Sequence, residues 1–430
     1  MNPVPFSEAP WLRMPSPFYE ETHRVWQKFC REFIGANFTQ YALQWENEGA
    51  VPAEVYRSFG KANMLAACLP APLPAKLLRE HGITHIGPLA VEDFDYTHTS
   101  IFLSEMMSCG LSGPVSSLIT GVAYGTPLLI DHAPQKIQSE LIPEILKGNK
   151  RICIAITEPD AGSDVAGLQA TAVKSADGKH YVVNGAKKWI TNGLWSDYAS
   201  TCVRTGGKGP GGLSLLLVPL KNDGVSVRRI AVSGRKCSGT SYIEFDDVKV
   251  PVENLIGKEG NGMKYIMNNF NHERLSIAIN TTNQARVALS SAFEYVTQRE
   301  AFGAPLINQP VVRNRLARAG AKLETQWAWV ESLVYQYKHL PAHEAASKLG
   351  GMTALVKANA GMVLNECAEC AQILFGGNGY TQSGKGELVE KIAREVAGVR
   401  VPGGSEDIML DLCIRQLYKG YTSQSTPSKL

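Results

Sequence analysis

The long helical segments after residue 262 constrain this chain most. Apolar residues recur three or four positions apart through segments near 263–299, 309–339, 341–373 and 405–419. Helices of this length carry a continuous apolar side that needs partners, and a bundle, extended across a subunit interface, is the natural way to bury it. The sequence therefore predicts a C-terminal helical bundle over residues 259–424.

Two different patterns precede this bundle. Residues 1–150 have helical spacing, for example in QKIQSELIPEILKG, whereas residues 151–258 alternate short apolar runs with turns that contain Gly and Asp. The Gly cluster at 206–212 lacks the spacing of a phosphate-binding loop, and we interpret it as a hairpin connection. We predict an α+β fold with four parts: an N-terminal helical domain (1–150), a middle antiparallel β domain (151–258), the bundle (259–424) and a flexible tail (425–430).

Composition gives little support to membrane, nucleic-acid-binding or metal-binding classes. No run reaches the roughly 18 apolar residues that a membrane span needs. The formal net charge is +3, and Lys and Arg are mixed among Asp and Glu, which disfavours nucleic-acid binding. Cys367 and Cys370 form a CxxC without a second Cys or His pair at zinc spacing, so we interpret it as helix packing and expect no metal.

The C-terminal residues indicate a destination in the cell. Ser428-Lys429-Leu430 is the peroxisomal import tripeptide, and it follows a polar TSQSTP stretch that would keep it exposed. The Pro-rich start has neither an apolar signal core nor an Arg-rich presequence. We expect a peroxisomal location, with the import receptor as a partner.

Two motifs in the β region combine small, hydroxyl and aromatic residues. Residues 155–164, AITEPDAGSD, begin as a buried strand and break into a turn whose small residues let amides and hydroxyls approach a polar ligand. Trp189 and Thr191 lie at alternate positions near the end of a second strand and are expected to point to one face. A flat ring system would find a stacking surface and a hydrogen-bond donor there.

These motifs, followed by REAFG at 299–303 and FGGNGY at 375–380, closely resemble the acyl-CoA dehydrogenase family over residues 130–415. The resemblance implies FAD between the β domain and the bundle, in a homodimer or homotetramer whose neighbouring subunit completes the site. It implies that Thr157 and Thr191 hydrogen-bond the flavin ring and that Trp189 covers its face. Further implied cofactor contacts are Ser163, Arg299, Phe302, Gln309, Gln372, Gly376 and Gly377.

Two positions depart from the family pattern. Family members usually carry Gln three residues before the Gly pair and eleven residues after the motif Arg, whereas these positions are Ile373 and Pro310 here. Gln372 and Gln309 each lie one residue earlier in the sequence. We keep both as candidate FAD contacts.

The resemblance also implies the catalytic groups. The reaction needs a base for the α-proton of an acyl-CoA and donors for the thioester oxygen. The family's common base position is Gly403 here, whose amide is then an implied thioester donor. A minority of members carry the base on a long helix in a Glu-Arg-Leu sequence, which matches Glu273-Arg274-Leu275. Glu273 is therefore the implied base, and Arg274 is implied to organise the site.

Other assignments of the acids remain open. Glu273 would have a purely structural role if it paired with a neighbour on its own helix. Glu406 and Asp407 are weaker candidates for the base, because a helix would turn them away from the position of Gly403.

We predict an FAD-dependent acyl-CoA dehydrogenase that forms trans-2-enoyl-CoA, in β-oxidation or in the biosynthesis of acyl precursors of secondary metabolites. The electron acceptor is an electron-transfer flavoprotein or O₂; O₂ would make the chain an acyl-CoA oxidase. The peroxisomal tripeptide favours O₂, although the chain is short for such oxidases. A non-catalytic flavin-containing nucleic-acid-binding protein is the alternative of another class, but acidic runs such as ELVEK in the C-terminal region oppose it.

Overall fold

The computed structural model describes residues 3–424, apart from the side chains of residues 342, 343, 346, 423 and 424. The chain divides into two compact units. The first comprises Met1–Gln27, Tyr96–Ser112 and Asn271–Leu430, and the second comprises Lys28–Asp95 and Gly113–Phe270. The predicted targeting tripeptide, Ser428-Lys429-Leu430, lies outside the described residues.

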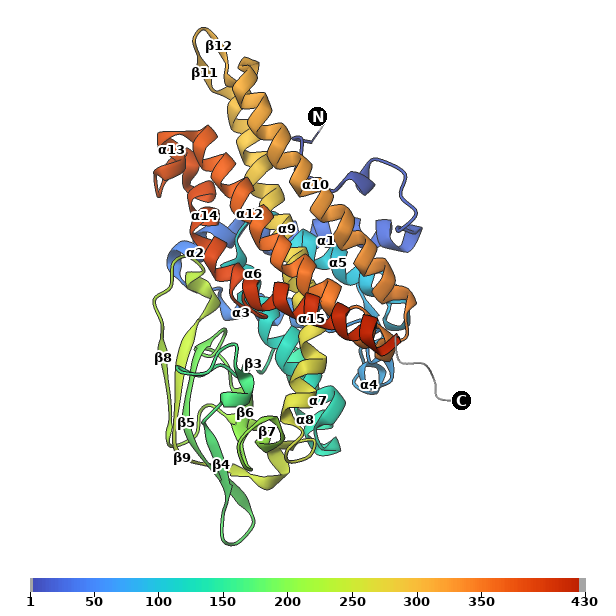
Figure 1. The fold of residues 1–430 in the computed structure, drawn as a ribbon, viewed down its shortest axis with the longest axis vertical. Coiled ribbons are helices and arrows are strands. Elements are labelled where there is room, and N and C mark those ends of the chain that lie inside the picture. The colour runs from blue at the N-terminus through green and yellow to red at the C-terminus, as the bar shows by residue number, and fades with distance from the viewer. Residues whose placement is uncertain (1–2, 425–430) are drawn as a thin grey trace. The chain divides into compact units, whose positions relative to one another are not determined.

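The second unit is built around an eight-stranded sheet (Figure 1). Its path is β10-β7-β6-β4-β5-β9-β8, and β3 pairs with β6 beside this path. Inward side chains of these strands form one apolar core, which includes Tyr181, Val183, Leu216, Val218 and Phe245. The strands are β3 (Ile152–Ala155), β4 (Thr171–Lys174), β5 (His180–Ile190), β6 (Tyr198–Arg204), β7 (Leu213–Pro219), β8 (Val225–Arg229), β9 (Ser241–Pro251) and β10 (Leu255–Ile256).

The sheet is mostly antiparallel, with one correction to the predicted pattern. β5 with β9, β6 with β7 and β8 with β9 pair antiparallel, and the 206–212 Gly cluster joins β6 to β7 as expected for a hairpin connection. In contrast, β3 and β4 both pair parallel with β6, with Ile152 opposite Tyr198 and Thr171 opposite Arg204. Parallel neighbours need a long crossover, and the chain between β3 and β6 supplies one that includes β4 and β5.

Helices and a small hairpin complete the second unit. α6, a π-helical turn at Gly121–Gly125 and α7 form one continuous helix from Ser112 to His132. This helix is long and apolar enough to cross a membrane, but 89% of its most apolar window is buried, which is typical of a core helix in a soluble protein. The elements are α2 (Ala42–Glu48), α3 (Ala53–Lys61), α4 (Ala75–Glu80), β1 (His85–Ile86), β2 (Leu89–Ala90), α6 (Ser112–Thr120), α7 (Thr126–His132) and α8 (Gln135–Leu146).

The first unit is a bundle of long helices (Figure 1). α9, α10, α12 and α14 share a core of small and branched apolar side chains, among them Ala288, Leu323, Leu364 and Ile392. Alanine at many core positions lets the helix backbones approach closely. The helices are α5 (Tyr96–Met106), α9 (Gly262–Gln298), α10 (Pro310–His339), α11 (Ala342–Lys348), α12 (Gly350–Phe375), α13 (Gly377–Tyr380), α14 (Glu387–Arg400) and α15 (Glu406–Gln424).

Three of the described helices belong to both units. α1 (Glu21–Asn37), α6 and α9 each contain residues of the first and of the second unit. Between α9 and α10, the short strands β11 (Glu300–Ala301) and β12 (Ala304–Pro305) form a hairpin that projects beyond the neighbouring helix ends (Figure 1).

The predicted order of N-terminal helices, a middle β-sheet and C-terminal helices is confirmed. The short apolar runs predicted between residues 151 and 258 correspond to strands, for example β6 over the run YASTCVR. The predicted domain boundaries at residues 150 and 258 stay a prediction.

Candidate functional site

The Glu273 carboxylate on α9 is the central acid of the candidate site. Its side chain is only partly exposed, and burial raises the pKa of Glu273 to about 7 against the opposing charges of Arg274 and Lys357. No hydrogen bond or ion pair of this carboxylate is found among residues 3–424. The structural alternative, in which Glu273 pairs with a helix neighbour, therefore finds no contact in the described chain.

The turn between α14 and α15 approaches Glu273. The Nε of Arg274 donates to the Gly403 carbonyl at 3.1 Å. Gly403 has a φ of 70°, and a Cβ built on it would lie 3.7 Å from Oε1 of Glu273. The structure thus brings the three predicted catalytic residues together, although α9 and the turn are far apart in the sequence.

The two weaker acid candidates are placed differently from Glu273. Both carboxylate oxygens of Glu406 accept hydrogen bonds from the Arg400 guanidinium, each at 2.8 Å. Asp407 is exposed at the start of α15. The Glu406 carboxylate is therefore paired with the Arg400 guanidinium at the start of the turn.

Sequence reasoning missed a buried lysine beside this turn. Lys357 on α12 is 2% exposed, and its Nζ donates to the carbonyls of Arg400 at 2.9 Å and Gly404 at 2.6 Å. The sequence did contain an indication of this role, because Lys357 is the only charged residue in the apolar stretch 350–365. A lone charge inside an otherwise apolar helix requires buried partners.

In the second unit, Thr157 and Trp189 are brought together at the ends of β3 and β5. The Lys188 amide donates to the Thr157 carbonyl at 2.9 Å, which joins the two motifs. Thr157 and Thr191 are half-buried, whereas Ser163 and Trp189 are exposed, with 48% of Trp189 accessible. These residues offer hydroxyl groups and an aromatic surface to a polar, flat ligand.

A buried ion pair fixes the loop that contains Thr157. Lys187 is fully buried, and its Nζ donates to the Ile156 carbonyl at 2.9 Å and to the Glu158 carboxylate at 2.8 Å. Glu158 also accepts from the amides of Gln169 at 2.6 Å and Ala170 at 2.9 Å. Sequence analysis missed this pair. Its signal was a lysine on the inward side of an apolar strand.

The placement of Trp189 and Thr191 on one face stays a prediction, because the strand is irregular between them. The register of β5 against β9 shifts between Lys187 and Ile190, and Trp189 has a φ of 59°. A strand that bulges in this way loses its two-residue period, so same-face placement does not follow from the spacing. The bulge leads into Asn192, whose side chain accepts from the Gly121 amide at 3.1 Å and donates to the Ser238 carbonyl at 3.1 Å.

The remaining predicted contacts lie in the first unit, in two groups. Arg299, Phe302 and Gln309 belong to the connection between α9 and α10, where Phe302 is 93% exposed at the tip of the projecting hairpin. Gln372 and the glycines Gly376 and Gly377 lie where α12 ends, and a Cβ at either glycine would meet open space. The two groups are connected because Tyr295 of α9 stacks on Phe375, with ring centroids 4.1 Å apart.

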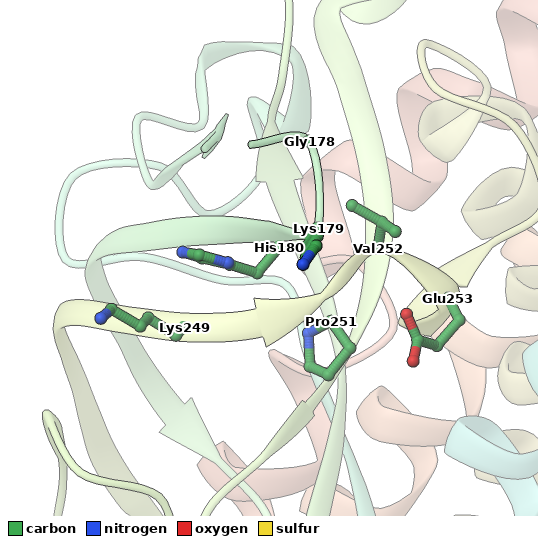
Figure 2. Close-up of a pocket in the computed structure, with 7 residues that line it drawn as sticks. All are labelled: Gly178, Lys179, His180, Lys249, Pro251, Val252 and Glu253. Atoms are coloured by element: carbon green, nitrogen blue, oxygen red, sulfur yellow. The ribbon is translucent and has the colours of Figure 1, made fainter. Parts of the chain in front are cut away.

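A hollow lies on the sheet of the second unit. Figure 2 shows its lining, which comes from the start of β5 and the end of β9: Gly178, Lys179, His180, Lys249, Pro251, Val252 and Glu253. Trp189 is at the opposite end of β5, about 30 Å away for an extended strand. The hollow is therefore not part of the Thr157 and Trp189 site.

Comparison with known proteins supplies family matches for most of the chain. Residues 153–248 match the model for the acyl-CoA dehydrogenase middle domain, and residues 260–418 match the model for the acyl-CoA dehydrogenase C-terminal domain. The chain is 59% identical to the acyl-CoA dehydrogenase apdG of Emericella nidulans, over 99% of this chain and 97% of that protein.

A second relative and a solved structure also match nearly the whole chain. The acyl-CoA dehydrogenase AFT10-1 of Alternaria alternata is 34% identical over 97% of this chain and 96% of that protein. Among solved structures, an acyl-CoA dehydrogenase from Geobacillus kaustophilus superposes with a TM-score of 0.83 at 26% identity, covering 94% of this chain and all of that one.

We predict that Lys187→Met destabilises the chain by about 3–5 kcal/mol, because the Glu158 carboxylate would stay buried without its cation. Urea unfolding followed by circular dichroism measures the change in the free energy of unfolding. Lys249→Met is the matched control, since Lys249 is exposed on the neighbouring strand β9. Equal stability of the two variants would show that the ion pair does not hold the Thr157 loop.

Proposed function

The chain belongs to the acyl-CoA dehydrogenase family, and we propose that Glu273 is the base that removes the α-proton of its acyl-CoA substrate. One observation carries the proposal. The Glu273 carboxylate lies 3.7 Å from the position where a side chain at Gly403 would begin. An acid on α9 thus reaches the space that a side chain from the turn would otherwise enter.

The surroundings of Glu273 suit a base that works near neutral pH. With a pKa of about 7, a substantial fraction of Glu273 is ionised at physiological pH, and the ionised carboxylate still binds a proton strongly enough to act as a base. Partial burial raises this affinity, while the Arg274 charge limits the rise. The Gly403 amide, in a turn fixed by Arg274, would donate to the thioester oxygen as enolate character develops.

FAD fits the other predicted residues. Trp189 presents a half-exposed ring at the end of β5, and Thr157 and Thr191 are partly accessible close to it in the sequence motifs. In the bundle, Gly376 and Gly377 leave open space for a close approach of the backbone. When bound, FAD supplies the hydride acceptor for the β-carbon. The protein's part is to orient the thioester and move the α-proton.

We predict that Glu273→Gln lowers the rate of anaerobic flavin bleaching by acyl-CoA about 10²- to 10⁴-fold, the usual contribution of a general base. In the wild type, the bleaching rate should rise with pH through about 7, because only the ionised carboxylate accepts a proton. At one pH unit below the pKa the rate should be about a tenth of its plateau. Stopped-flow absorbance with a panel of acyl-CoAs measures both effects.

Asp407→Asn is the control for this experiment, because Asp407 is an exposed acid near the same turn. It should leave bleaching unchanged. Full activity in Glu273→Gln, or loss only in Asp407→Asn, would remove Glu273 from the role of base. Readmission of O₂ after bleaching then tests the acceptor, since rapid reoxidation with peroxide formation identifies an acyl-CoA oxidase.

We also propose a peroxisomal location, which Ser428-Lys429-Leu430 supports. An N-terminal fluorescent fusion of the full chain should accumulate in peroxisomes, as seen by co-localisation with a matrix marker. Reversing the order of the last three residues keeps the composition and should leave the fusion in the cytosol. Peroxisomal accumulation of the reversed variant would contradict the proposal.

We further propose a homodimer or homotetramer. The exposed face of α15 supports this assembly, because Ile414, Leu417, Tyr418 and Tyr421 are each more than half exposed and lie three or four residues apart. The projecting hairpin with Phe302 at its tip is a second exposed apolar feature. A neighbouring copy would cover both.

Replacing Ile414 and Leu417 by Asp should shift the assembly to smaller species, because the charges would remain unpaired in an apolar interface. Light scattering after size-exclusion chromatography measures the mass. Val173→Asp is the control, since Val173 is 65% exposed on β4 and outside this face. A wild-type monomer, or an unchanged mass in the double variant, would contradict the role of the α15 face.

A further inference from the structure

We propose that Lys357 is a positioning residue for proton abstraction: it holds the turn from Arg400 to Gly404 beside Glu273 and places a positive charge near that carboxylate. The inference rests on the proposed function, because it requires that Glu273 is the base. Lys357 itself contacts neither the substrate nor the cofactor in this proposal.

A single ammonium group joins the two ends of the turn. Its bonds to the Arg400 and Gly404 carbonyls, at 2.9 Å and 2.6 Å, span the four residues that lead from α14 toward α15. Lys357 is 2% exposed, so water cannot readily replace these donors. Both hydrogen bonds are partly buried, and a carbonyl that loses its donor there is costly, so the turn would change shape to recover one.

Lys357 acts together with two other contacts at this turn. Arg274 donates to the Gly403 carbonyl at 3.1 Å, and Arg400 clamps Glu406 through two bonds of 2.8 Å. The carbonyls of residues 400, 403 and 404 are therefore all oriented by buried cations from α9 and α12. This fixes the backbone at Gly403, from which the thioester donor is expected.

The charge of Lys357 acts on Glu273 in addition to the hydrogen bonds. The charged and titratable groups around Glu273 are Arg274 on α9 and Lys357 on α12, with Tyr337 on α10 and Glu406 on α15 acting on these two cations. Desolvation raises the pKa of Glu273, and only Arg274 and Lys357 oppose the rise. Loss of Lys357 should therefore raise the pKa of Glu273 further.

Lys357 remains charged over most of the range in which Glu273 ionises. Desolvation lowers the pKa of Lys357 to about 8, and the nearby Glu273 charge opposes this decrease. Below that pH its ammonium supplies both the two donors and the charge. A lysine with a purely structural role would affect stability but would not move the titration of Glu273.

The test compares Lys357→Met with Lys357→Arg. Methionine keeps the length but removes the donors and the charge, and we expect the midpoint of the pH–bleaching profile to rise by about one unit. At a pH below both midpoints the rate should then fall about tenfold. Lys357→Arg retains the charge and should keep the midpoint close to that of the wild type. If the Met variant does not fold, Lys357→Gln supplies the neutral side chain.

The control is Lys322→Met. Lys322 is an exposed lysine on α10 that pairs with Glu366 of α12, so this variant also removes a lysine contact of α12 but lies away from the turn. Its midpoint should match that of the wild type.

A second readout does not depend on turnover. Infrared difference spectra against pH follow the protonated carboxyl band of Glu273 in the protein without substrate, and loss of this band in Glu273→Gln assigns it. The band should titrate at higher pH in Lys357→Met than in the wild type or in Lys322→Met.

The outcomes separate the two proposals. If bleaching survives in Glu273→Gln, the assignment of the base fails. If Glu273→Gln is inactive but Lys357→Met has the same midpoint and carboxyl titration as Lys322→Met, only the role of Lys357 fails. A raised midpoint in the neutral variant together with a normal one in Lys357→Arg supports the inference.

Discussion

Buried backbone carbonyls need hydrogen-bond donors, and two lysines supply them where this chain turns near its functional residues. In the sheet, Lys187 binds the Ile156 carbonyl and the Glu158 carboxylate. In the bundle, Lys357 binds the carbonyls at both ends of the turn that contains Gly403. Each ammonium gives hydrogen bonds to two acceptors, and each loop can therefore stay irregular inside a packed protein. The placement of Thr157 and of Gly403 depends on these two side chains.

The pKa of Glu273 results from two opposing effects, desolvation and the charges of neighbouring cations. Removing the carboxylate from water favours its protonated form, whereas Arg274 and Lys357 favour the ionised form. A fully buried acid without cations would hold its proton too tightly, and an exposed acid would bind it too weakly to accept one from carbon. The same two cations also orient the backbone of the facing turn. Arg274 and Lys357 thus affect both the position of the turn and the pKa of Glu273.

Much of the fold could be predicted from the sequence because its signals are local. Helical spacing located the long helices, and the short apolar runs located the strands of the sheet. Glu273 was found through the Glu-Arg-Leu motif and through Gly403, which has no side chain at the family's common base position. The partners of Lys357 lie 43 and 47 residues away, so no local pattern could predict them. The bulge at Trp189 was missed for a related reason, since register depends on the partner strand β9.

The geometry at Gly403 limits how a second acid could be placed beside Glu273. The Cβ of a side chain added at residue 403 would lie 3.7 Å from Oε1 of Glu273 and 2.7 Å from Cδ1 of Ile277, so Ile277 would have to shift. A carboxylate that reached Glu273 from residue 403 would compete with it for a proton, because two nearby carboxylates resist ionising together. A side chain at 403 would also have to adopt a φ of 70°, which costs residues other than glycine about 1–2 kcal/mol. A second acid at residue 403 would therefore need a shifted Ile277 and a strained backbone before its carboxylate could act.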